Sequence, residues 1–326
     1  MYKQSKIKVC LHIGFHKTAS TFLQDKVFSH INEINFLGRD NSGNWFSKNR
    51  DVFLKDIIYM NIKSFESKYE NINIVDFLKI EEFKINILSE EKLSSLFYCS
   101  NNLEELFKRI KFIFKENLFE LKIFYFIRNQ KDLIVSRYSE NSLKFKKFNS
   151  SIKKFSDLSK QVFPENINFS RDFLINWKYF YFYQELNKNI KHSKIKFLIY
   201  EEFVLNREKK ILEILDFFEI KNYTKINFGK VYETFKIFDY NEDKIFLTEV
   251  HNLLKKIIGT NIFRVLIDKN NLLKLIIKRL IIMVGIIKNP IRRNREYDQK
   301  INNYYIEDNI KLEHHFKIDL KKFNYY

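Results

Sequence analysis

The sequence predicts an α/β fold in which helices flank a central parallel sheet, and two observations support this. First, apolar runs with the composition of buried strands recur at Ile7–Ile13, Lys84–Leu88, Leu121–Ile127 and Lys194–Ile199. Second, segments with helical spacing separate these runs, and strands that alternate with helices form parallel sheets with right-handed crossovers. The 326 residues suffice for one large domain with an appendage.

Helices are expected between the strands, at Ser20–His30, Leu103–Lys115, Lys131–Ser139, Arg171–Leu186 and Glu208–Phe218. Ser170 is a good N-cap for the fourth of them, which contains Trp177. The lysine- and serine-rich segment Lys144–Lys160 is expected to be a loop or lid.

The domain organisation follows from the same pattern. We expect residues 1–240 to form the α/β core, with insertions at 31–81 and 141–169. Residues 241–326 are expected to form a helical C-terminal extension packed on this core.

The composition is basic, with a net charge of +18, and this favours anionic ligands. Acidic glycans, anionic membranes and nucleic acid would all suit such a charge, but no RNA-binding signature accompanies the lysines, so nucleic acid is not an expected partner. Only two cysteines occur, which excludes a disulfide scaffold, and no Cys/His pattern has zinc spacing, so no metal is expected.

One apolar stretch, Asn270–Asn289, bears on location. Its uncharged run Leu280–Ile287 is too short to span a bilayer, which needs about 20 apolar residues. A helix packed on the domain is the favoured interpretation, and a basic amphipathic helix on the inner membrane surface is the alternative. Because the N-terminus shows no signal peptide, we expect a cytoplasmic protein, with peripheral membrane contact left open.

The most informative segment is Lys8–Leu23, KVCLHIGFHKTASTFL, which has the order strand, polar loop, helix. A helix N-terminus exposes unpaired N–H groups and the positive end of its dipole, and therefore suits a phosphate. Lys17 adds a full charge, and the hydroxyls of Thr18, Ser20 and Thr21 add donors.

The loop lacks the GxxxxGKS or GxxxxGKT pattern of nucleotide triphosphatases. It resembles instead the 5′-phosphosulfate loop of bacterial sulfotransferases, which reads roughly HIGxHKTGTTxLQ. Ala19 stands at a usual glycine and Ser20 at a usual threonine. We expect Ala19 to have a negative φ, since an L-residue is disfavoured at positive φ.

A second motif, LKIFYFIRNQKDLIVSRYSE at Leu121–Glu140, resembles the 3′-phosphate motif RNPxxxxxSxY of the same family. Arg128 stands at the carboxyl end of a strand, where open α/β sheets bind ligands, and the resemblance assigns it and Ser136 to the 3′-phosphate. A planar guanidinium matches phosphate oxygens two at a time. Gln130 replaces the usual proline, and we expect it to loosen the loop.

Later segments resemble the same proteins, namely the string FLIYEEFVLNREKKILEILDFFEI and the tail Tyr304–Tyr326. The resemblance implies a P-loop-like sulfotransferase fold and an enzyme that moves a sulfuryl group from 3′-phosphoadenosine 5′-phosphosulfate (PAPS) to a hydroxyl or amine. The product would be adenosine 3′,5′-bisphosphate (PAP), and no metal would be required. The residues it implies for donor binding are Gly14, Lys17, Thr18, Ala19, Ser20, Thr21, Arg128 and Ser136.

The catalytic assignments are Lys17, which would neutralise charge on the departing phosphate, and a general base. Glu90 is the first choice of base, Glu91 the second and His16 the third. For Glu201 and Glu202 we expect a structural role in capping or bracing the following helix.

A basic, aromatic-rich chain suits a carbohydrate or glycolipid acceptor. Two alternative functions remain at this point. One is a P-loop kinase-like phosphotransferase, and the other is a non-catalytic basic protein that binds nucleic acid or membrane.

Overall fold

The computed structural model describes residues 5–15, 18–38, 48–94, 103–136, 177–221 and 295–326. The chain divides into two compact units. The first comprises Met1–Gln130, Ile167–Lys236 and Asn302–Tyr326, and the second comprises Lys131–Asn166 and Ile237–Ile301. Part of the expected C-terminal extension therefore belongs to the unit that contains the sheet.

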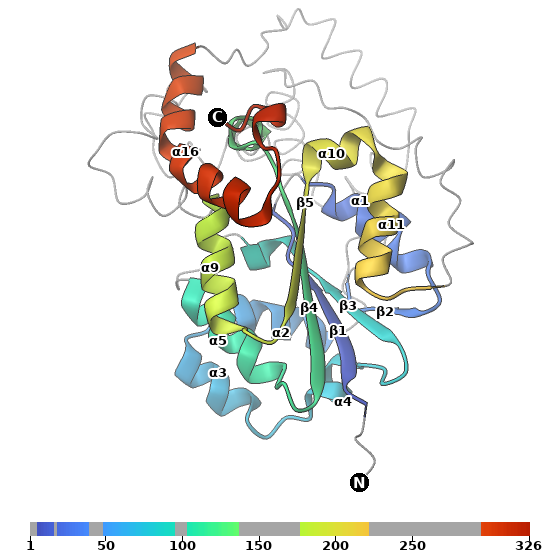
Figure 1. Ribbon diagram of the computed structural model, residues 1–326. Coiled ribbons are helices and arrows are strands. Elements are labelled where there is room, and N and C mark those ends of the chain that lie inside the picture. Colours follow the sequence, from blue (N-terminus) through green and yellow to red (C-terminus); the bar gives the residue numbers. More distant parts are fainter. Residues whose placement is uncertain (1–4, 16–17, 39–47, 95–102, 137–176, 222–294) are drawn as a thin grey trace, which may run out of the picture. The chain divides into compact units, whose positions relative to one another are not determined.

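The sheet has five parallel strands in the order β2-β3-β1-β4-β5, which confirms the predicted fold class (Figure 1). Their bounds are β1 Ile7–His12, β2 Ile34–Phe36, β3 Ile85–Ser89, β4 Phe119–Ile127 and β5 Lys194–Ile199. The edge strand β2 lies in the segment expected as an insertion and was not predicted, because three residues are too few to show a period.

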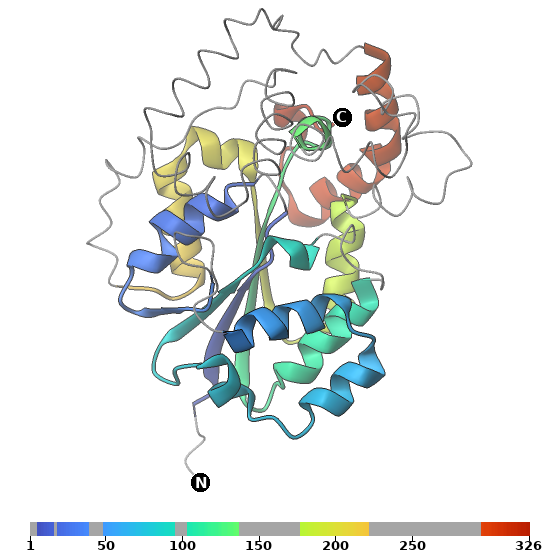
Figure 2. The same cartoon turned by 180° about the vertical axis from the view of Figure 1, so that it is seen from behind.

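Helices cover both faces of this sheet (Figures 1 and 2). One face carries α1 Ser20–Lys26, the 3₁₀ turn Phe28–His30, α10 Tyr200–Leu205 and α11 Arg207–Phe217. The other face carries α2 Lys48–Tyr59, α3 Ile62–Tyr69, α5 Leu103–Ile113 and α9 Tyr179–Asn189. The short helix α4 Ile74–Leu78 precedes β3, a helical segment runs from Gln130 to Ser136, and α16 spans Arg295–Phe316.

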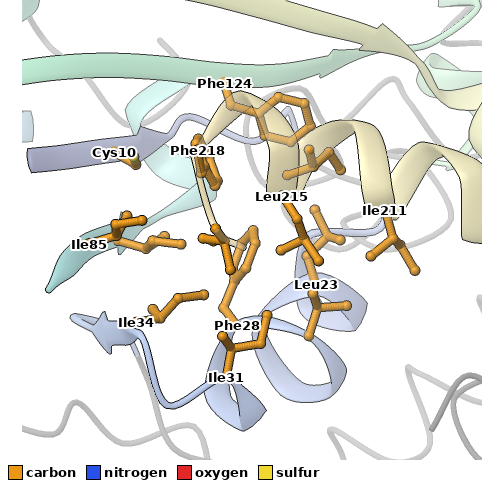
Figure 3. Close-up of a cluster of buried hydrophobic side chains, with 14 of the residues drawn as sticks. Cys10, Leu23, Phe28, Ile31, Ile34, Ile85, Phe124, Ile211, Leu215 and Phe218 are labelled. Carbon is orange, nitrogen blue, oxygen red and sulfur yellow. The ribbon is translucent and has the colours of Figure 1, made fainter. Parts of the chain in front are cut away.

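The core beneath α1 and α11 is a single apolar cluster (Figure 3). Strand residues such as Cys10 and Phe124 meet Leu23 and Phe28 from one side and Leu215 from the other. Alternate residues of a strand point to the same face of the sheet. The residues of β1 and β4 that lie between those in the cluster therefore point to the opposite face, which α5 and α9 cover. The cluster thus fixes where the carboxyl end of β1 lies.

Helix α9 begins later than predicted, at Tyr179, and Trp177 precedes it. The cause lies far along the chain: the Asp308 carboxylate on α16 accepts hydrogen bonds from Phe180 N at 2.9 Å and Tyr181 N at 3.0 Å. A carboxylate on these unpaired N–H groups acts as a cap and complements the helix dipole. Ser170, the cap expected from the sequence, lies outside the described residues.

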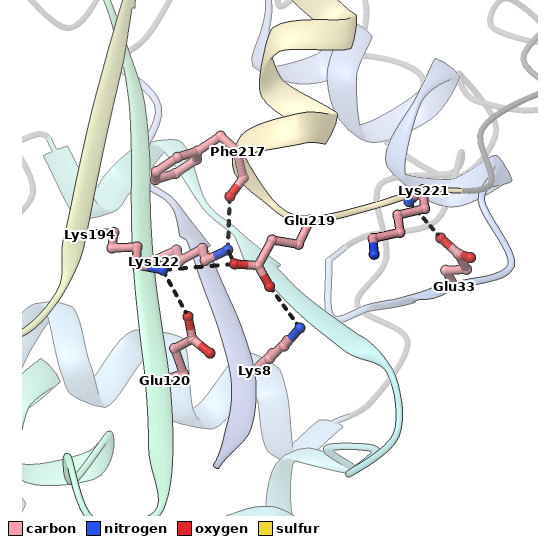
Figure 4. A network of polar contacts seen from close by, with 8 residues as sticks. All are labelled: Lys8, Glu33, Glu120, Lys122, Lys194, Phe217, Glu219 and Lys221. Atoms are coloured by element: carbon pink, nitrogen blue, oxygen red, sulfur yellow. Dashed lines mark hydrogen bonds and ion pairs between the residues drawn. The ribbon is translucent and has the colours of Figure 1, made fainter. Parts of the chain in front are cut away.

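An ion cluster joins the end of α11 to the sheet (Figure 4). The Lys122 ammonium is buried, pairs with Glu219 at 2.7 Å, and donates to Phe217 O at 2.9 Å. Lys8 pairs with the same carboxylate at 2.7 Å. Hydrogen bonds from Lys122 and Lys8 lower the pKa of Glu219 to about 2. The cluster satisfies a terminal helix carbonyl and anchors α11 to β1 and β4.

No helix within the described parts of the chain is both long and apolar enough to cross a membrane. The stretch Asn270–Asn289 and the expected lid Lys144–Lys160 lie outside the described residues.

Candidate active site

The expected site lies where the strand order reverses. The connection after β1 leads toward β2, whereas the connection after β4 leads toward β5, on the opposite side of the sheet. Ligands in open α/β sheets bind outside the carboxyl ends of two such strands. Ile13 N donates to Phe124 O at 2.8 Å, so the two strands stay paired up to the start of the loop.

The first residue of the loop, Gly14, has no room for a side chain. A Cβ built there would lie 2.3 Å from Ser20 Oγ and 3.5 Å from Glu91 Cγ. The Gly14 carbonyl accepts a hydrogen bond of 2.5 Å from the buried Ser94 hydroxyl, which also contacts Glu91 O at 3.0 Å. Ser94 thus holds the start of the loop, and no sequence pattern had marked it.

The three hydroxyls of the loop differ in availability. Thr18 is buried, and its hydroxyl donates to Phe15 O, so its hydrogen is used within the loop. Ser20 is only 1% exposed, and its hydroxyl has no hydrogen-bond partner among the described residues. Thr21 is exposed on the first turn of α1. Within the described residues, the Thr18 hydroxyl is therefore committed to the loop, the Ser20 hydroxyl is buried with its hydrogen unused, and the Thr21 hydroxyl is exposed to solvent. His16 and Lys17 lie outside the described residues.

Ala19, the single alanine of the chain, has φ 65° and ψ 17° and precedes α1. The expectation of a negative φ was therefore wrong. Its carbonyl accepts the first intrahelical bond, from Leu23 N at 3.0 Å, so the loop must turn into the helix at this residue. A left-handed conformation costs an L-residue about 1–2 kcal/mol.

A buried histidine supports the loop from within the sheet. Gln24 Nε2 donates to Ser89 Oγ at 2.8 Å, and the same hydroxyl forms a hydrogen bond of 2.7 Å with His12 Nδ1. The His12 ring stacks on Phe124 at 5.3 Å, and burial lowers its pKa to about 4. The neutral ring links the ends of β1 and β3 to α1, an arrangement the sequence did not suggest.

Arg128 follows β4 and is only 7% exposed. Its guanidinium lies over the Tyr200 ring, 4.7 Å from the centroid. Its backbone is fixed by Tyr179, whose hydroxyl donates to Arg128 O at 2.6 Å and accepts from Arg128 N at 3.2 Å. Tyr179 and Tyr200 were not assigned to the site, because neither lies near Arg128 in sequence.

The two glutamates after β5 have different roles. Glu202 pairs with Lys210 at 2.7 Å and braces α11, as expected. Glu201 does more than brace its own helix, since it accepts from Asn129 N at 2.9 Å and from the Tyr325 hydroxyl at 3.0 Å. Burial raises the pKa of Glu201.

Gln130 does not loosen the segment, contrary to expectation. It is only 1% exposed, donates to Trp177 O at 3.1 Å, and exchanges two hydrogen bonds with the side-chain amide of Asn309. Ser136 is buried on the helical segment that follows, and its role in binding phosphate stays a prediction.

The candidate bases stand just after β3. Glu90 is 7% exposed, and its N–H donates to His12 O at 3.2 Å. Glu91 is less buried, and its side chain runs past Gly14. The choice between them stays a prediction.

Comparison with known proteins identifies the family. The model of the sulfotransferase domain matches residues 10–244. Among solved structures, a sulfotransferase from Alicyclobacillus acidocaldarius is similar at 11% identity and a TM-score of 0.43, over 82% of this chain and 97% of that one. Mouse sulfotransferase SULT7A1 complexed with PAP is similar at 14% identity and a TM-score of 0.35, over 72% and 66%.

No curated protein matches. The assignment therefore rests on the domain model, which covers most of the chain and includes both the loop after β1 and Arg128 after β4. The chain belongs to the sulfotransferase family and is a transferase enzyme.

Proposed function

We propose that this protein transfers the sulfuryl group of PAPS to a hydroxyl or amine of a carbohydrate or glycolipid acceptor and releases PAP. The observation that carries the proposal is the matched domain, within which the loop and Arg128 follow two adjacent parallel strands. Family membership favours this function over a kinase-like phosphotransferase or a non-catalytic basic binder.

The residues suit a donor with two phosphate sites. The buried Ser20 hydroxyl and the exposed Thr21 hydroxyl are donors for the 5′-phosphosulfate, together with Lys17 and the backbone N–H groups of the loop. Arg128 offers a planar fork to the 3′-phosphate, and Ser136 offers a hydroxyl.

In the proposed step, an acceptor oxygen or nitrogen attacks sulfur as the bond to the bridging oxygen breaks. The electron pair of that bond stays on the 5′-phosphate of PAP, and the acceptor's proton passes to the base. Lys17 stabilises the charge that grows on the leaving phosphate, and charge stabilisation of this kind dominates such in-line transfers.

Donor binding by the full chain tests the proposal most directly. We expect PAP to bind at least tenfold more tightly than ATP in isothermal titration, because only PAP has a 3′-phosphate for Arg128. Tighter binding of ATP would favour a phosphotransferase, and salt-dependent DNA binding without affinity for PAP would favour a nucleic-acid binder.

Two site variants test the residue assignments. Lys17→Ala should lower turnover by about a hundredfold, since one preorganised charge is lost. Lys26→Ala is its control, because it removes the same charge from the far end of α1. Arg128→Lys keeps the charge but loses the fork, and should raise the KM for PAPS about tenfold. Full activity in both site variants would refute the assignment.

The base is tested by the pH dependence of turnover. Glu90→Gln, Glu91→Gln and His16→Gln are compared, and the variant that loses the acidic limb of the profile, where the rate falls because the base is protonated, identifies the base. A normal rate in Glu90→Gln would eliminate our first choice.

The acceptor class rests on composition, a net charge of +18 with 17% aromatic residues. Transfer of labelled sulfate to cell-surface glycan extracts, followed by mass spectrometry of the products, tests this acceptor class. Label that appears only on protein or on small phenols would contradict it.

We also propose a cytoplasmic location, with peripheral membrane contact as the alternative. Cell fractionation of the full chain and of a chain that lacks Leu272–Ile287 distinguishes the two.

A further inference from the structure

We propose that the C-terminal tail, Leu320–Tyr325, positions Arg128 for the 3′-phosphate of the donor. The inference rests on the proposed function, because it concerns how well that one cation is placed. It is carried by hydrogen bonds that link the tail to Asn129 directly and through Glu201, and to Gln130 through Asn309, all within the first compact unit.

The first link runs from Asn129 to the tail. Its side-chain amide, on a residue that is only 3% exposed, donates to Phe323 O at 2.8 Å and to Asn324 O at 2.7 Å. An amide has two hydrogens, so both are used by the tail. Asn324 follows the 3₁₀ turn Lys321–Phe323 and has a left-handed φ of 56°. At this turn the two successive carbonyls, of Phe323 and Asn324, both face the Asn129 side chain.

The second link returns from the tail to the same segment. The Tyr325 hydroxyl donates to Glu201 at 3.0 Å, and the other oxygen of Glu201 accepts from Asn129 N at 2.9 Å. Asn129 is therefore held by both its backbone and its side chain, and the tail takes part in both contacts. The Tyr325 side chain is buried, so these bonds are sheltered from water.

The third link joins the next residue to α16. The side-chain amides of Gln130 and Asn309 bond to each other at 2.9 and 3.2 Å, and Asn309 also donates to Tyr325 O at 3.2 Å. Asn309 thus contacts the segment and the tail at once.

These contacts matter because Asn129 directly follows Arg128 in the chain, so fixing the backbone of Asn129 also fixes that of Arg128. The two N–H groups of a guanidinium meet two phosphate oxygens only within a narrow range of position and angle. A residue that shifts the backbone by about 1 Å can reduce such recognition strongly without touching the ligand. The tail is therefore a positioning element for the donor site, and it does not contact the reacting atoms.

The test compares two nucleotides that differ only in the 3′-phosphate, PAP and adenosine 5′-monophosphate. The Kd of adenosine 5′-monophosphate divided by the Kd of PAP, both measured with the full chain, gives the contribution of the 3′-phosphate site. Tyr325→Phe removes only the hydroxyl that binds Glu201, and Asn129→Ala removes both bonds to the tail. Tyr125→Phe is the matched control, because it removes the same atom from a buried ring whose hydroxyl has no partner among the described residues.

We expect the ratio to fall about tenfold in Asn129→Ala and several-fold in Tyr325→Phe, with binding of adenosine 5′-monophosphate nearly unchanged and the control like wild type. An unchanged ratio, or an equal loss for both nucleotides, would overturn the inference even where the melting temperature falls. If Asn129→Ala does not fold, the milder Tyr325→Phe decides. A wild-type protein that binds both nucleotides equally would overturn the proposed function, and with it the inference.

Discussion

Replacing a buried tyrosine by phenylalanine is expected to have opposite effects on stability at two positions of this chain. Tyr125 on β4 and Tyr179 at the start of α9 are fully buried, and both rings pack edge-on against Phe15, at 6.0 and 5.2 Å. The Tyr179 hydroxyl bonds both backbone groups of Arg128, whereas the Tyr125 hydroxyl has no partner within the described residues. Replacing each by phenylalanine removes one oxygen from nearly the same surroundings.

The magnitudes follow from the cost of an unsatisfied buried group, about 1–3 kcal/mol, and the net value of a hydrogen bond, about 1 kcal/mol. Tyr125→Phe removes an unsatisfied hydroxyl, and should raise the free energy of unfolding by about 1 kcal/mol. Tyr179→Phe breaks two bonds and leaves the N–H and C=O of Arg128 without this partner, and should lower it by about 3 kcal/mol. The two variants should therefore differ by about 4 kcal/mol.

Urea unfolding followed by tryptophan fluorescence measures this difference, since Trp177 is buried two residues before Tyr179. Equal slopes for the variants and the wild type would show that the midpoints can be compared. The reasoning fails if the two variants agree to within about 0.5 kcal/mol, or if Tyr125→Phe is the less stable one. Tyr179→Phe should also weaken PAP binding, because it releases the backbone of Arg128.

Two further predictions concern backbone strain and acid stability. Ala19→Gly should raise the free energy of unfolding by about 0.5 kcal/mol, because relief of the left-handed strain exceeds the entropy that glycine adds to the unfolded chain. Lys79→Gly is the control, because Lys79 also has a left-handed φ of 56° but lies far from the loop in sequence, and it should raise the free energy of unfolding by a similar amount. A lower stability of Ala19→Gly in urea unfolding would contradict the left-handed conformation of Ala19. The pKa of Glu219 is about 2 in the folded protein against 4.5 ordinarily, so its stabilisation is complete above pH 4.5 and is lost as the pH falls toward 2. Glu219→Gln should therefore flatten the loss of stability over that range in urea titrations, and a slope like that of wild type would refute this.

The sequence predicted those parts of the fold that depend on short-range pattern. Four strands were found because each is a continuous apolar run, and β5 was placed at its observed bounds. The edge strand β2 is too short to show a period, and the start of α9 depends on Asp308, more than 120 residues away. No local propensity carries information about a cap that another helix supplies.

The same distinction applies to the candidate site. The loop and Arg128 could be proposed from the sequence because each is a compact motif beside a strand. Ser94, Tyr179 and the tail were missed because they reach the site only through the fold, and Asn129 contacts Asn324 across 195 positions. The error at Ala19 has another cause: intrinsic φ preference is weak, and the geometry of the turn into α1 overrides it.

Gln130 shows what replaces local rigidity in this chain. A proline at the first position of a helix fixes φ without losing a needed hydrogen bond, so the related motif RNP stiffens its turn covalently. Glutamine has no such constraint, and among the described residues its side chain is held by hydrogen bonds to Asn309 and to Trp177 O. The stiffness of the turn after Arg128 therefore depends on α16 and on the segment before α9 being in place. Loss of structure at the C-terminus should then weaken donor recognition before it unfolds the sheet, because β4 itself is held by β1 and β5 rather than by the tail.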